Sequence, residues 1–382
     1  MVVVLCLSID EWAPSGEHEW QRWLRFVQPE ERKRIGRFVF EKDRRRALVG
    51  RLGLRFAIAN LFDDVRWDEI LLGRSKRNKP TLELPAGRSE RISFNMAHHG
   101  SWVVVAAMVS RAGPKAILAD DTSKNTVFGL VGVDVMTVEA PRGKKRSVAD
   151  FFKTMNASFG EKEWEEIKKV TPVELNRAIR CKGLDTVDDS APASLPIPAG
   201  CVSPSEAGQL HQFYRFWALK ESYIKAVGVG LAFGLERLQF SVDYRAKPPV
   251  ISLQVDERQV EKVEAELESE DGKDEVEVEA MPRVHGGRWQ FHLATLGDQG
   301  MNIIAVAVKT RNCDGNHGSG GKSICNNANS CLEEATATAA AASTNIPARS
   351  IDDVLSASKG GAPAYTRVSR EQVLLCAQPL SL

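Results

Sequence analysis

Glu221 and Lys225 have the types and spacing of a reactive pair in a predicted helix over residues 213–228. They are one helical turn apart and lie with Trp217 in a row at the edge of the helix's apolar face. A carboxylate and an ammonium group at the margin of a buried stripe form a candidate site. The simpler alternative is an ordinary helical ion pair, which contributes about 0.2–0.5 kcal/mol. The helix alone favours that alternative.

A second candidate carboxylate, Asp134, lies inside a predicted strand over 128–136. Strand alternation places Asp134 on the same face as Gly132 and Met136, opposite three valines. Aspartate is depleted within strands, and an unpaired buried charge is costly, so Asp134 should face a cation. Gly132 leaves space for another group to approach the backbone closely.

Two stretches nearer the N-terminus are candidate phosphate contacts. The loop 73–80 contains four cations in six residues, and clustered like charges contribute nothing to a core. Asn95 and His98 lie at a predicted polar corner between two strands within 91–107. A lone histidine at such a corner is usually a satisfied structural group, but two histidines beside an asparagine favour a ligand contact.

Together these residues predict a magnesium-dependent reaction on a phosphorylated substrate. Magnesium typically takes one or two protein carboxylates and completes its shell with water and substrate phosphates. Asp134 and Glu221 are the best pair of carboxylates for that role. Lys220 falls inside the apolar arc of the same helix, and we expect its side chain to extend along the apolar surface towards the phosphates.

Several predicted elements must position these residues. A long helix over 43–60 has one apolar face, and most of its arginines are expected to face solvent. Shorter helical pieces are predicted over 148–159 and 161–170. Further strands are predicted over 2–7, 67–72, 238–242, 250–255, 288–293 and 301–308.

The chain divides into two predicted halves and a tail. Residues 1–122 form the N-terminal half, and 123–310 form the C-terminal half. The C-terminal half contains insertions at about 182–208, which is rich in Pro, Ala, Ser and Asp, and at about 259–286, which is acidic. The tail, 311–382, has low complexity, and we expect it to be disordered and assign it no function.

Composition narrows the class of protein. Hydrophobic residues make up 43% of the chain and charged residues 26%, as in an ordinary globular protein. The net charge of +1 hides a basic segment over 22–55, which implies an anionic partner. Seven cysteines without CxxC spacing argue against a disulfide framework or a zinc site. No run approaches the roughly 18–20 apolar residues that span a bilayer. We therefore expect a cytoplasmic protein without a membrane segment.

The motifs resemble those of a known family. Gly132-Val133-Asp134, followed by Trp217-x-x-Lys220-Glu221-Ser222-x-x-Lys225, resembles the two signatures of the 4′-phosphopantetheinyl transferases of the Sfp type, and most of all their eukaryotic branch. That branch has counterparts of four further stretches. These run from Gln28 to Phe40, from Arg74 to Pro80, from Phe94 to His98 and from Val227 to Leu231. The resemblance covers about residues 1–310.

The resemblance implies a reaction as well as a fold. The family transfers the phosphopantetheine arm of coenzyme A to a serine of an apo acyl- or peptidyl-carrier domain, with Mg²⁺ on the pyrophosphate, and 3′,5′-ADP leaves. Asp134 and Glu221 would bind the metal, Glu221 would be the base, directly or through a metal-bound water, and Lys225 would neutralise the pyrophosphate. The coenzyme A contacts would be Arg34, Arg74, Ser75, Lys76, Arg77, Asn78, Lys79, Asn95, Met96, Ala97, His98 and Lys225. The implied fold is α+β, with two pseudo-twofold-related halves that each pack a small antiparallel sheet on a long helix.

Two positions depart from the family pattern. Met136 stands where many members have a third metal carboxylate, so the metal should keep an extra water. Ala97 stands where a serine or threonine precedes the histidine, which removes a hydroxyl contact. Neither change abolishes the proposed chemistry.

The expected partners are carrier domains of fatty acid synthase, polyketide or nonribosomal synthases and aminoadipate reductase. The expected enzyme is a monomeric holo-[acyl-carrier-protein] synthase that binds no nucleic acid. One alternative is an inactive adaptor that binds coenzyme A or carriers. The other is a nucleic-acid-binding protein using the basic segment, although no recognised nucleic-acid motif accompanies it.

Overall fold

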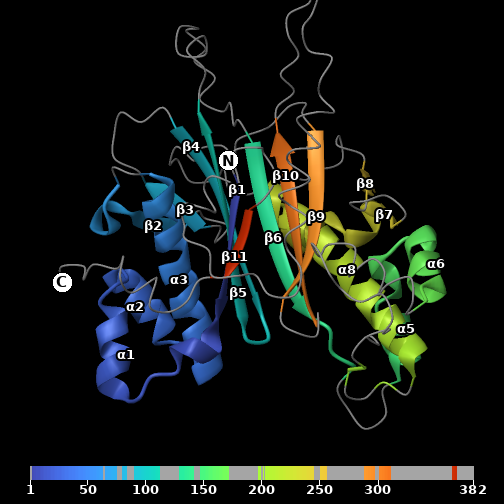
Figure 1. Ribbon diagram of the computed structural model, residues 1–382, viewed down its shortest axis with the longest axis horizontal. Coiled ribbons are helices and arrows are strands. Elements are labelled where there is room, and N and C mark those ends of the chain that lie inside the picture. Colours follow the sequence, from blue (N-terminus) through green and yellow to red (C-terminus); the bar gives the residue numbers. More distant parts are fainter. Residues whose placement is uncertain are drawn as a thin grey trace, which may run out of the picture.

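The computed structural model describes residues 2–62, 65–74, 80–83, 90–111, 129–141, 147–171, 197–198, 201, 203–244, 250–255, 288–296, 301–310 and 364–367. These residues form an α+β fold with two sheets side by side at its centre and helices on the two outer sides (Figure 1). None of the described helices is both long enough and apolar enough to cross a membrane.

The first sheet has the strand order β11-β1-β5-β4. Its strands are β1 (Val2–Ser8), β4 (Glu90–His99), β5 (Trp102–Arg111) and β11 (Ala364–Arg367). The long helix α3 (Glu41–Leu61) packs on its outer face, beside α1 (Glu17–Leu24) and α2 (Pro29–Ile35). The pairs β1–β5 and β4–β5 are antiparallel, whereas β11 pairs with β1 in parallel.

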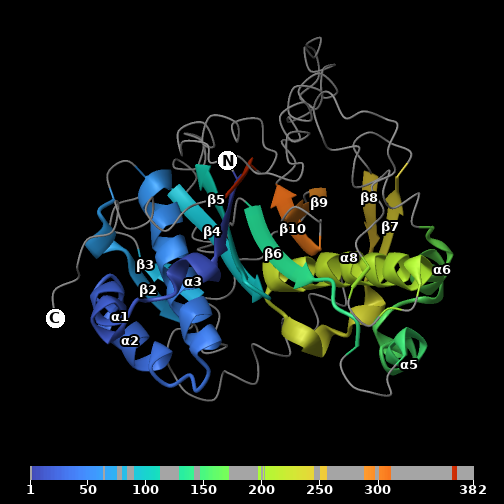
Figure 2. The ribbon, with the colours of Figure 1, turned by 60° about the horizontal axis from the view of Figure 1, so that its bottom comes forward.

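The second sheet has the order β6-β10-β9, and both of its pairs are antiparallel. Its strands are β6 (Gly129–Thr137), β9 (Arg288–Leu296) and β10 (Asn302–Thr310). Helix α8 (Pro204–Val227) crosses its outer face (Figure 2). Helices α5 (Val148–Thr154) and α6 (Glu161–Lys169) pack around α8 away from the sheet, and the hairpin of β7 (Gln239–Asp243) and β8 (Val250–Gln254) lies beside β9. A small hairpin, β2 (Leu71–Arg74) and β3 (Pro80–Glu83), lies beside α3.

Three hydrophobic clusters hold these layers together. One lies between α3 and the first sheet, and another lies between α8 and the second sheet. The third joins the inner faces of the two sheets and includes the valines of β6 opposite Asp134. Because β5 contributes to two clusters, residues 103–108 are buried on both faces, as suits their unbroken apolar run.

Helix α8 is longer than the predicted helix. It begins at Pro204, where the Ser203 side chain caps Glu206 N, and it ends at Gly228, whose φ of 81° suits a left-handed cap. The predicted insertion at 182–208 therefore extends too far, because the helix occupies its last residues. Most of that insertion, and all of the one at 259–286, lie outside the described residues.

Three other predictions need correction. Residues 67–72 do not form one strand, because Trp67–Glu69 make a 3₁₀ turn before β2. The 91–107 hairpin turns at Gly100, with φ of 55°, so Asn95 and His98 lie within β4 and not at its corner. In the tail, β11 adds an unforeseen strand to the first sheet, and the rest of 311–382 is outside the described residues.

The arginines of α3 do not all face solvent as expected. Arg51 and Arg55 are buried and pair with Glu31 of α2, both at 3.2 Å. Arg55 also donates to Gln28 Oε1 and to the carbonyl oxygens of the segment that leads into β2. This network fixes α2 and β2, the elements that carry Arg34 and Arg74, against α3.

Candidate functional site

The candidate site begins where β6 and α8 cross. Gly132 of β6 faces the helix, and a Cβ atom there would collide with the Ser222 carbonyl oxygen and with the nitrogen and Cβ of Ala226. The prediction of a close backbone approach at Gly132 is confirmed, and the group that approaches is α8. The crossing brings the face of β6 that carries Asp134 against the turn of α8 that carries Glu221 and Lys225.

Asp134 is buried, with 5% of its surface exposed, and it faces a cation as predicted. Its Oδ1 accepts a hydrogen bond of 2.6 Å from Lys225 Nζ. Its Oδ2 is buried and has no hydrogen-bond partner among the described residues. Burial raises the pKa of Asp134, and the Lys225 charge and the Val135 backbone N–H oppose that rise. One oxygen of this carboxylate is therefore available to a further ligand.

Glu221 is half-buried next to this pair. Its pKa is raised first by burial and then by the negative charge of Asp134, and Lys225 opposes both effects. Glu221 and Lys225 do not form the ordinary helical ion pair, because Lys225 pairs with Asp134 of β6 instead. The result is two mutually repelling carboxylates and one ammonium group, whose side chain is 30% exposed.

This donor set fits a divalent cation, which the sequence predicted. The unpartnered Oδ2 of Asp134 and the repulsion between Asp134 and Glu221 would both be relieved by added positive charge. Within the described ranges no group of three or more His, Cys, Asp and Glu side chains gathers at a metal-binding distance. A metal here would therefore depend on two carboxylates plus oxygen atoms from water and substrate.

Strand β4 is held beside the open edge of β6 by its own side chains. The outward N–H groups of β6 donate to β4 at three alternate positions: Val131 N to Ser93 Oγ, Val133 N to Asn95 Oδ1, and Thr137 N to His99 Nδ1. At the remaining alternate position, the β4 residue is Ala97, which has no acceptor. The sequence interpretation missed Ser93 and His99, although their period-2 spacing with Asn95 is the signal of a shared strand face.

Asn95 and Met96 make protein contacts in this arrangement. Asn95 joins β6 to α8, because its Nδ2 also donates to the Lys225 carbonyl oxygen at 3.4 Å. Met96 points to the other face of β4, where its sulfur lies against Gly50 of α3. Both residues therefore position the two sides of the site.

His98 lies near charged residues of both α8 and the first turns of α3. Its side chain is exposed, but surrounding atoms desolvate the ring enough to lower its pKa, and the charges of Arg46 and Lys225 lower the pKa further. Asp43 acts in the opposite direction. Arg46 is fixed by hydrogen bonds to the Gly100 carbonyl oxygen and to Asp43. The charges of Arg46 and Lys225 thus make the surroundings of His98 positive, which suits an anion, and the sequence interpretation missed Arg46.

The remaining predicted phosphate contacts are not gathered here. Arg34 is exposed in the last turn of α2, and no hydrogen bond or ion pair between described residues links it to Asp134 or Lys225. Arg74 ends β2, and its side chain is not described. Ser75 to Lys79 lie outside the described residues.

Lys220 does not reach the phosphates, so that prediction is wrong. Its side chain is fully buried on the other side of α8. Nζ donates to Glu163 Oε2 at 2.6 Å and to the carbonyl oxygens of Ser158 and Leu235 at 3.0 and 2.9 Å. The ring of Phe159 lies 4.6 Å from the ammonium group. Three acceptors satisfy its three donors, so Lys220 anchors α8 to α6 and its neighbours.

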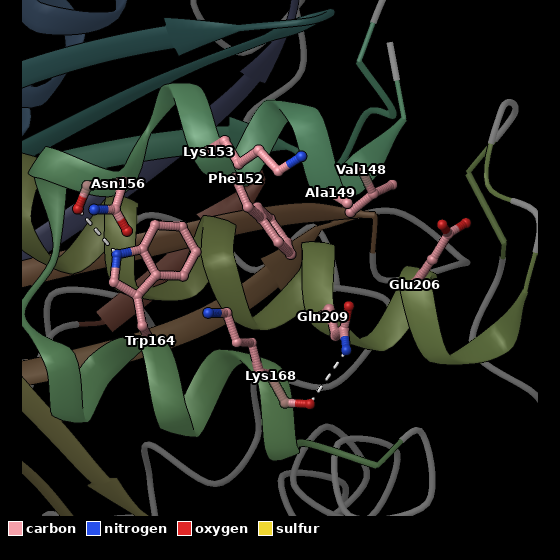
Figure 3. A pocket seen from close by; sticks show the side chains of 9 residues that line it. All are labelled: Val148, Ala149, Phe152, Lys153, Asn156, Trp164, Lys168, Glu206 and Gln209. Atoms are coloured by element: carbon pink, nitrogen blue, oxygen red, sulfur yellow. Dashed lines mark hydrogen bonds between the residues drawn. The ribbon is translucent and has the colours of Figure 1, made fainter.

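A separate hollow of about 330 Å³ lies between α5, α6 and the first turns of α8 (Figure 3). Its polar groups bond within the protein: Trp164 Nε1 donates to Asn156 O, and Gln209 Nε2 donates to Lys168 O. The Lys168 ammonium group stands 5.6 Å from the Trp164 ring centre. The hollow contains none of the carboxylate cluster.

Family models of known proteins match two parts of the chain. A family model described as 4′-phosphopantetheinyl transferase, N-terminal, matches residues 10–110. A second, described as 4′-phosphopantetheinyl transferase superfamily, matches residues 130–276, which include Asp134 and Glu221.

Individual relatives match about three-fifths of the chain. The L-aminoadipate-semialdehyde dehydrogenase-phosphopantetheinyl transferase of Xenopus laevis is 35% identical over 60% of this chain and 59% of its own length. The human protein of that name is 33% identical over 62% and 59%. A phosphopantetheinyl transferase of Thraustochytrium is 34% identical over 62% and 64%. The chain thus spans about three-fifths of the length of the curated relatives it matches.

Proposed function

We propose, from the premise that this chain belongs to the 4′-phosphopantetheinyl transferase superfamily, that it transfers the 4′-phosphopantetheine arm of coenzyme A to a serine of an apo carrier domain. The observation that carries the proposal is the buried Asp134–Lys225 pair, with one carboxylate oxygen unpartnered and Glu221 beside it.

The reaction balances with the groups of this site. The serine hydroxyl attacks the β-phosphorus of coenzyme A, the bond from that phosphorus to the bridging oxygen breaks, and 3′,5′-ADP leaves with that oxygen. Glu221 takes the proton of the hydroxyl as general base. Lys225, held in place by Asp134, neutralises the pyrophosphate. Asp134 and Glu221 would hold Mg²⁺, which supplies positive charge to the pyrophosphate and the leaving group.

The two halves contribute different parts of this site. The N-terminal half, 1–122, would bind phosphates through His98, Arg34 and the loop Arg74 to Lys79. The C-terminal half, 123–310, would supply the carboxylates and Lys225. A pseudo-twofold relation between the halves is supported by α3 and α8, which each pack on the outer face of their own sheet. Met136, half-buried on the Asp134 side of β6, offers no oxygen, so the metal would keep an extra water.

The protein partners would be carrier domains. The name of the Xenopus laevis and human relatives links those proteins to aminoadipate-semialdehyde dehydrogenase, which makes the carrier domain of aminoadipate reductase the first candidate. Fatty acid, polyketide and nonribosomal synthases are further candidates. We propose a monomeric enzyme of the cytoplasm.

The test is the mass of the carrier. The protein is incubated with Mg²⁺, coenzyme A and several apo carrier domains, and each carrier is weighed by intact-protein mass spectrometry. We expect one phosphopantetheine arm on at least one carrier, no transfer in excess EDTA, and a large loss with Glu221→Gln. If no carrier gains mass while coenzyme A binds equally well without Mg²⁺, the protein is a binding adaptor and the proposal fails.

A further inference from the structure

Two nitrogen-rich side chains are buried one turn apart in the first half of α8. His211 is 0% exposed and Arg215 is 5% exposed. Positions i and i+4 of a helix lie on one face, with about 5–6 Å between their Cβ atoms, so these two side chains are neighbours. The proposed transfer reaction uses neither of them, because Glu221 and Lys225 lie in the last turns of the helix.

One part of this cluster is complete within the protein. Arg215 Nη1 donates to the Tyr244 hydroxyl oxygen at 3.4 Å, and that hydroxyl donates to Gln212 Oε1 at 2.8 Å. The Arg215 guanidinium group also lies 5.7 Å from the centre of the Tyr244 ring. Tyr244, which directly follows β7, thus ties the β7–β8 hairpin to α8 and restricts the position of the Arg215 side chain.

The other part of the cluster has no partner. Nδ1 and Nε2 of His211 and Nε of Arg215 are all buried, and none of them forms a hydrogen bond with the residues that the structure describes. Within the same residues no carboxylate pairs with Arg215, whose recorded contacts are those with Tyr244. A buried donor without an acceptor is costly, and a buried charge without a counterion is more so.

The charge of Arg215 favours an anion over a water molecule as the missing partner. A water molecule could accept from Arg215 Nε and contact His211, but it would leave the guanidinium charge without a counterion. The Tyr244 ring compensates that charge only in part. An anion both accepts the N–H groups and neutralises the charge. The imidazole supplies at least one N–H donor in either protonation state, so His211 can bind the same anion.

The small number of donors limits the kind of anion. The unpartnered groups are one N–H of Arg215 and one or two of His211. Phosphate or sulfate has several oxygen atoms that would each need a donor, and most of them would stay unpaired in this buried place. A halide ion has a single charge and no fixed acceptor directions. We propose that His211 and Arg215 form a buried chloride site in the first half of α8.

The site would connect the stability of the C-terminal half to the chloride concentration. Chloride held by Arg215 neutralises the residue through which Tyr244 connects the β7–β8 hairpin to α8. An ion that binds the folded chain and not the unfolded chain raises stability as its concentration rises. The proposal is independent of the transfer reaction, because it concerns neither coenzyme A nor the carrier.

The first experiment follows thermal unfolding of the full chain at neutral pH. Sodium chloride replaces sodium gluconate at constant ionic strength, because gluconate is too large to be enclosed. We expect Tm of the wild type to rise by about 2–4 °C between no chloride and about 200 mM chloride. His211→Phe and Arg215→Met should lose this rise. Arg22→Gln, which removes an exposed arginine of α1, is the matched control and should keep it. A wild-type Tm that does not respond to chloride, or an equal response in both site variants, overturns the proposal.

A second measurement does not depend on whether the variants fold. Crystals of the wild type are grown or soaked in sodium bromide, and anomalous diffraction locates the bromide ions. A bromide peak within hydrogen-bond reach of both His211 and Arg215 Nε supports the site. A water molecule at that place, or no bromide beside these two residues, overturns it.

Discussion

Lys220 and Lys225 lie five residues apart on α8 and form ion pairs of the same length, 2.6 Å, in opposite environments. Lys220 is fully buried, and Glu163 and two carbonyl oxygens accept hydrogen bonds from all three of its donors. Glu163 is satisfied as well, because it also accepts from Phe240 N and Gly160 N. Lys225 is partly exposed, and its partner Asp134 keeps a buried oxygen without a bond. The first pair is complete within the protein, whereas the second leaves one carboxylate oxygen that a ligand could contact.

The difference assigns two tasks to one helix. A fully bonded buried pair adds nothing to chemistry, but it fixes the rotation of α8 about its axis and hence the direction of Glu221. An incompletely bonded pair costs stability and remains reactive towards cations and phosphates. Variants of Glu163 and Asp134 test that difference, and variants of Gly132 and His211 test how α8 is held.

Glu163→Gln should have the largest effect on stability. It leaves the Lys220 ammonium group buried without a counterion, which lowers the free energy of unfolding by about 3–5 kcal/mol. Urea unfolding followed by tryptophan fluorescence measures the loss. The double variant Glu163→Gln/Lys220→Met removes both charges but keeps an acceptor for Phe240 N, so it should recover most of it. If Glu163→Gln lowers the free energy of unfolding by less than about 1 kcal/mol, the Glu163–Lys220 pair does not anchor α8.

Asp134→Asn should lower activity strongly and leave stability almost unchanged. The amide keeps the shape and an acceptor for Lys225 but loses the charge, so the rate of transfer should fall about 10²–10³-fold. Stability should stay close to that of the wild type, because a desolvated carboxylate with an unpartnered oxygen has been removed. Transfer kinetics and urea unfolding are measured together. A loss of stability as large as that of Glu163→Gln would mean that the Asp134 pair is structural too.

Gly132→Ala should weaken the packing of β6 against α8 where the two cross. The added Cβ meets backbone atoms of Ser222 and Ala226, so β6 and α8 must move apart, at a cost of about 1–3 kcal/mol. The rate of transfer should fall with it, since Asp134 and Glu221 lie on either side of the crossing. Gly16→Ala is the control, because a Cβ there meets nothing within 4 Å, and it should change stability by less than about 0.5 kcal/mol.

The last effect is a pH dependence of stability, and it concerns His211 in α8. It is buried, neither ring nitrogen has a hydrogen-bond partner within the described residues, and burial together with Arg215 lowers its pKa to about 3. The unfolded chain takes up this proton near pH 6.5 and the folded protein near pH 3, so stability is full above pH 6.5 and is lost as pH falls towards 3. The slope is at most about 1.4 kcal/mol per pH unit.

Replacing the imidazole tests that slope. His211→Gln removes the titrating group, so its free energy of unfolding should depend less on pH between 6.5 and 3. Urea unfolding at a series of pH values compares the variant with the wild type. Equal slopes in the two proteins would show that His211 is protonated at the same pH in the folded and unfolded chains.

Local patterns predicted much of the site. A glycine and an aspartate two residues apart in a strand indicated a close approach and a cation, and both are present. The row of Glu221 and Lys225 followed from helical spacing. The patterns did not indicate which residue each charged side chain pairs with. Lys220 looked like the misplaced residue, yet its partner Glu163 is 57 positions away in sequence.

The same limit explains the other errors. Arg51 and Arg55 looked like a solvated edge of α3, because their burial depends on Glu31 in another helix. The contact of Asn95 with β6 was missed, because nothing local shows that β6 presents an unpaired edge to β4. Helical and strand periods report which face a residue occupies. They do not report what packs against that face.

The central claim is that the Asp134–Lys225 pair takes part in the reaction, whereas the Glu163–Lys220 pair does not. The most direct test weighs one apo carrier domain after equal incubation with coenzyme A, Mg²⁺ and the wild type, Asp134→Asn or the Glu163→Gln/Lys220→Met double variant. We predict that the wild type and the double variant add one phosphopantetheine arm, while Asp134→Asn leaves the carrier almost unmodified. Full modification by Asp134→Asn would contradict the account.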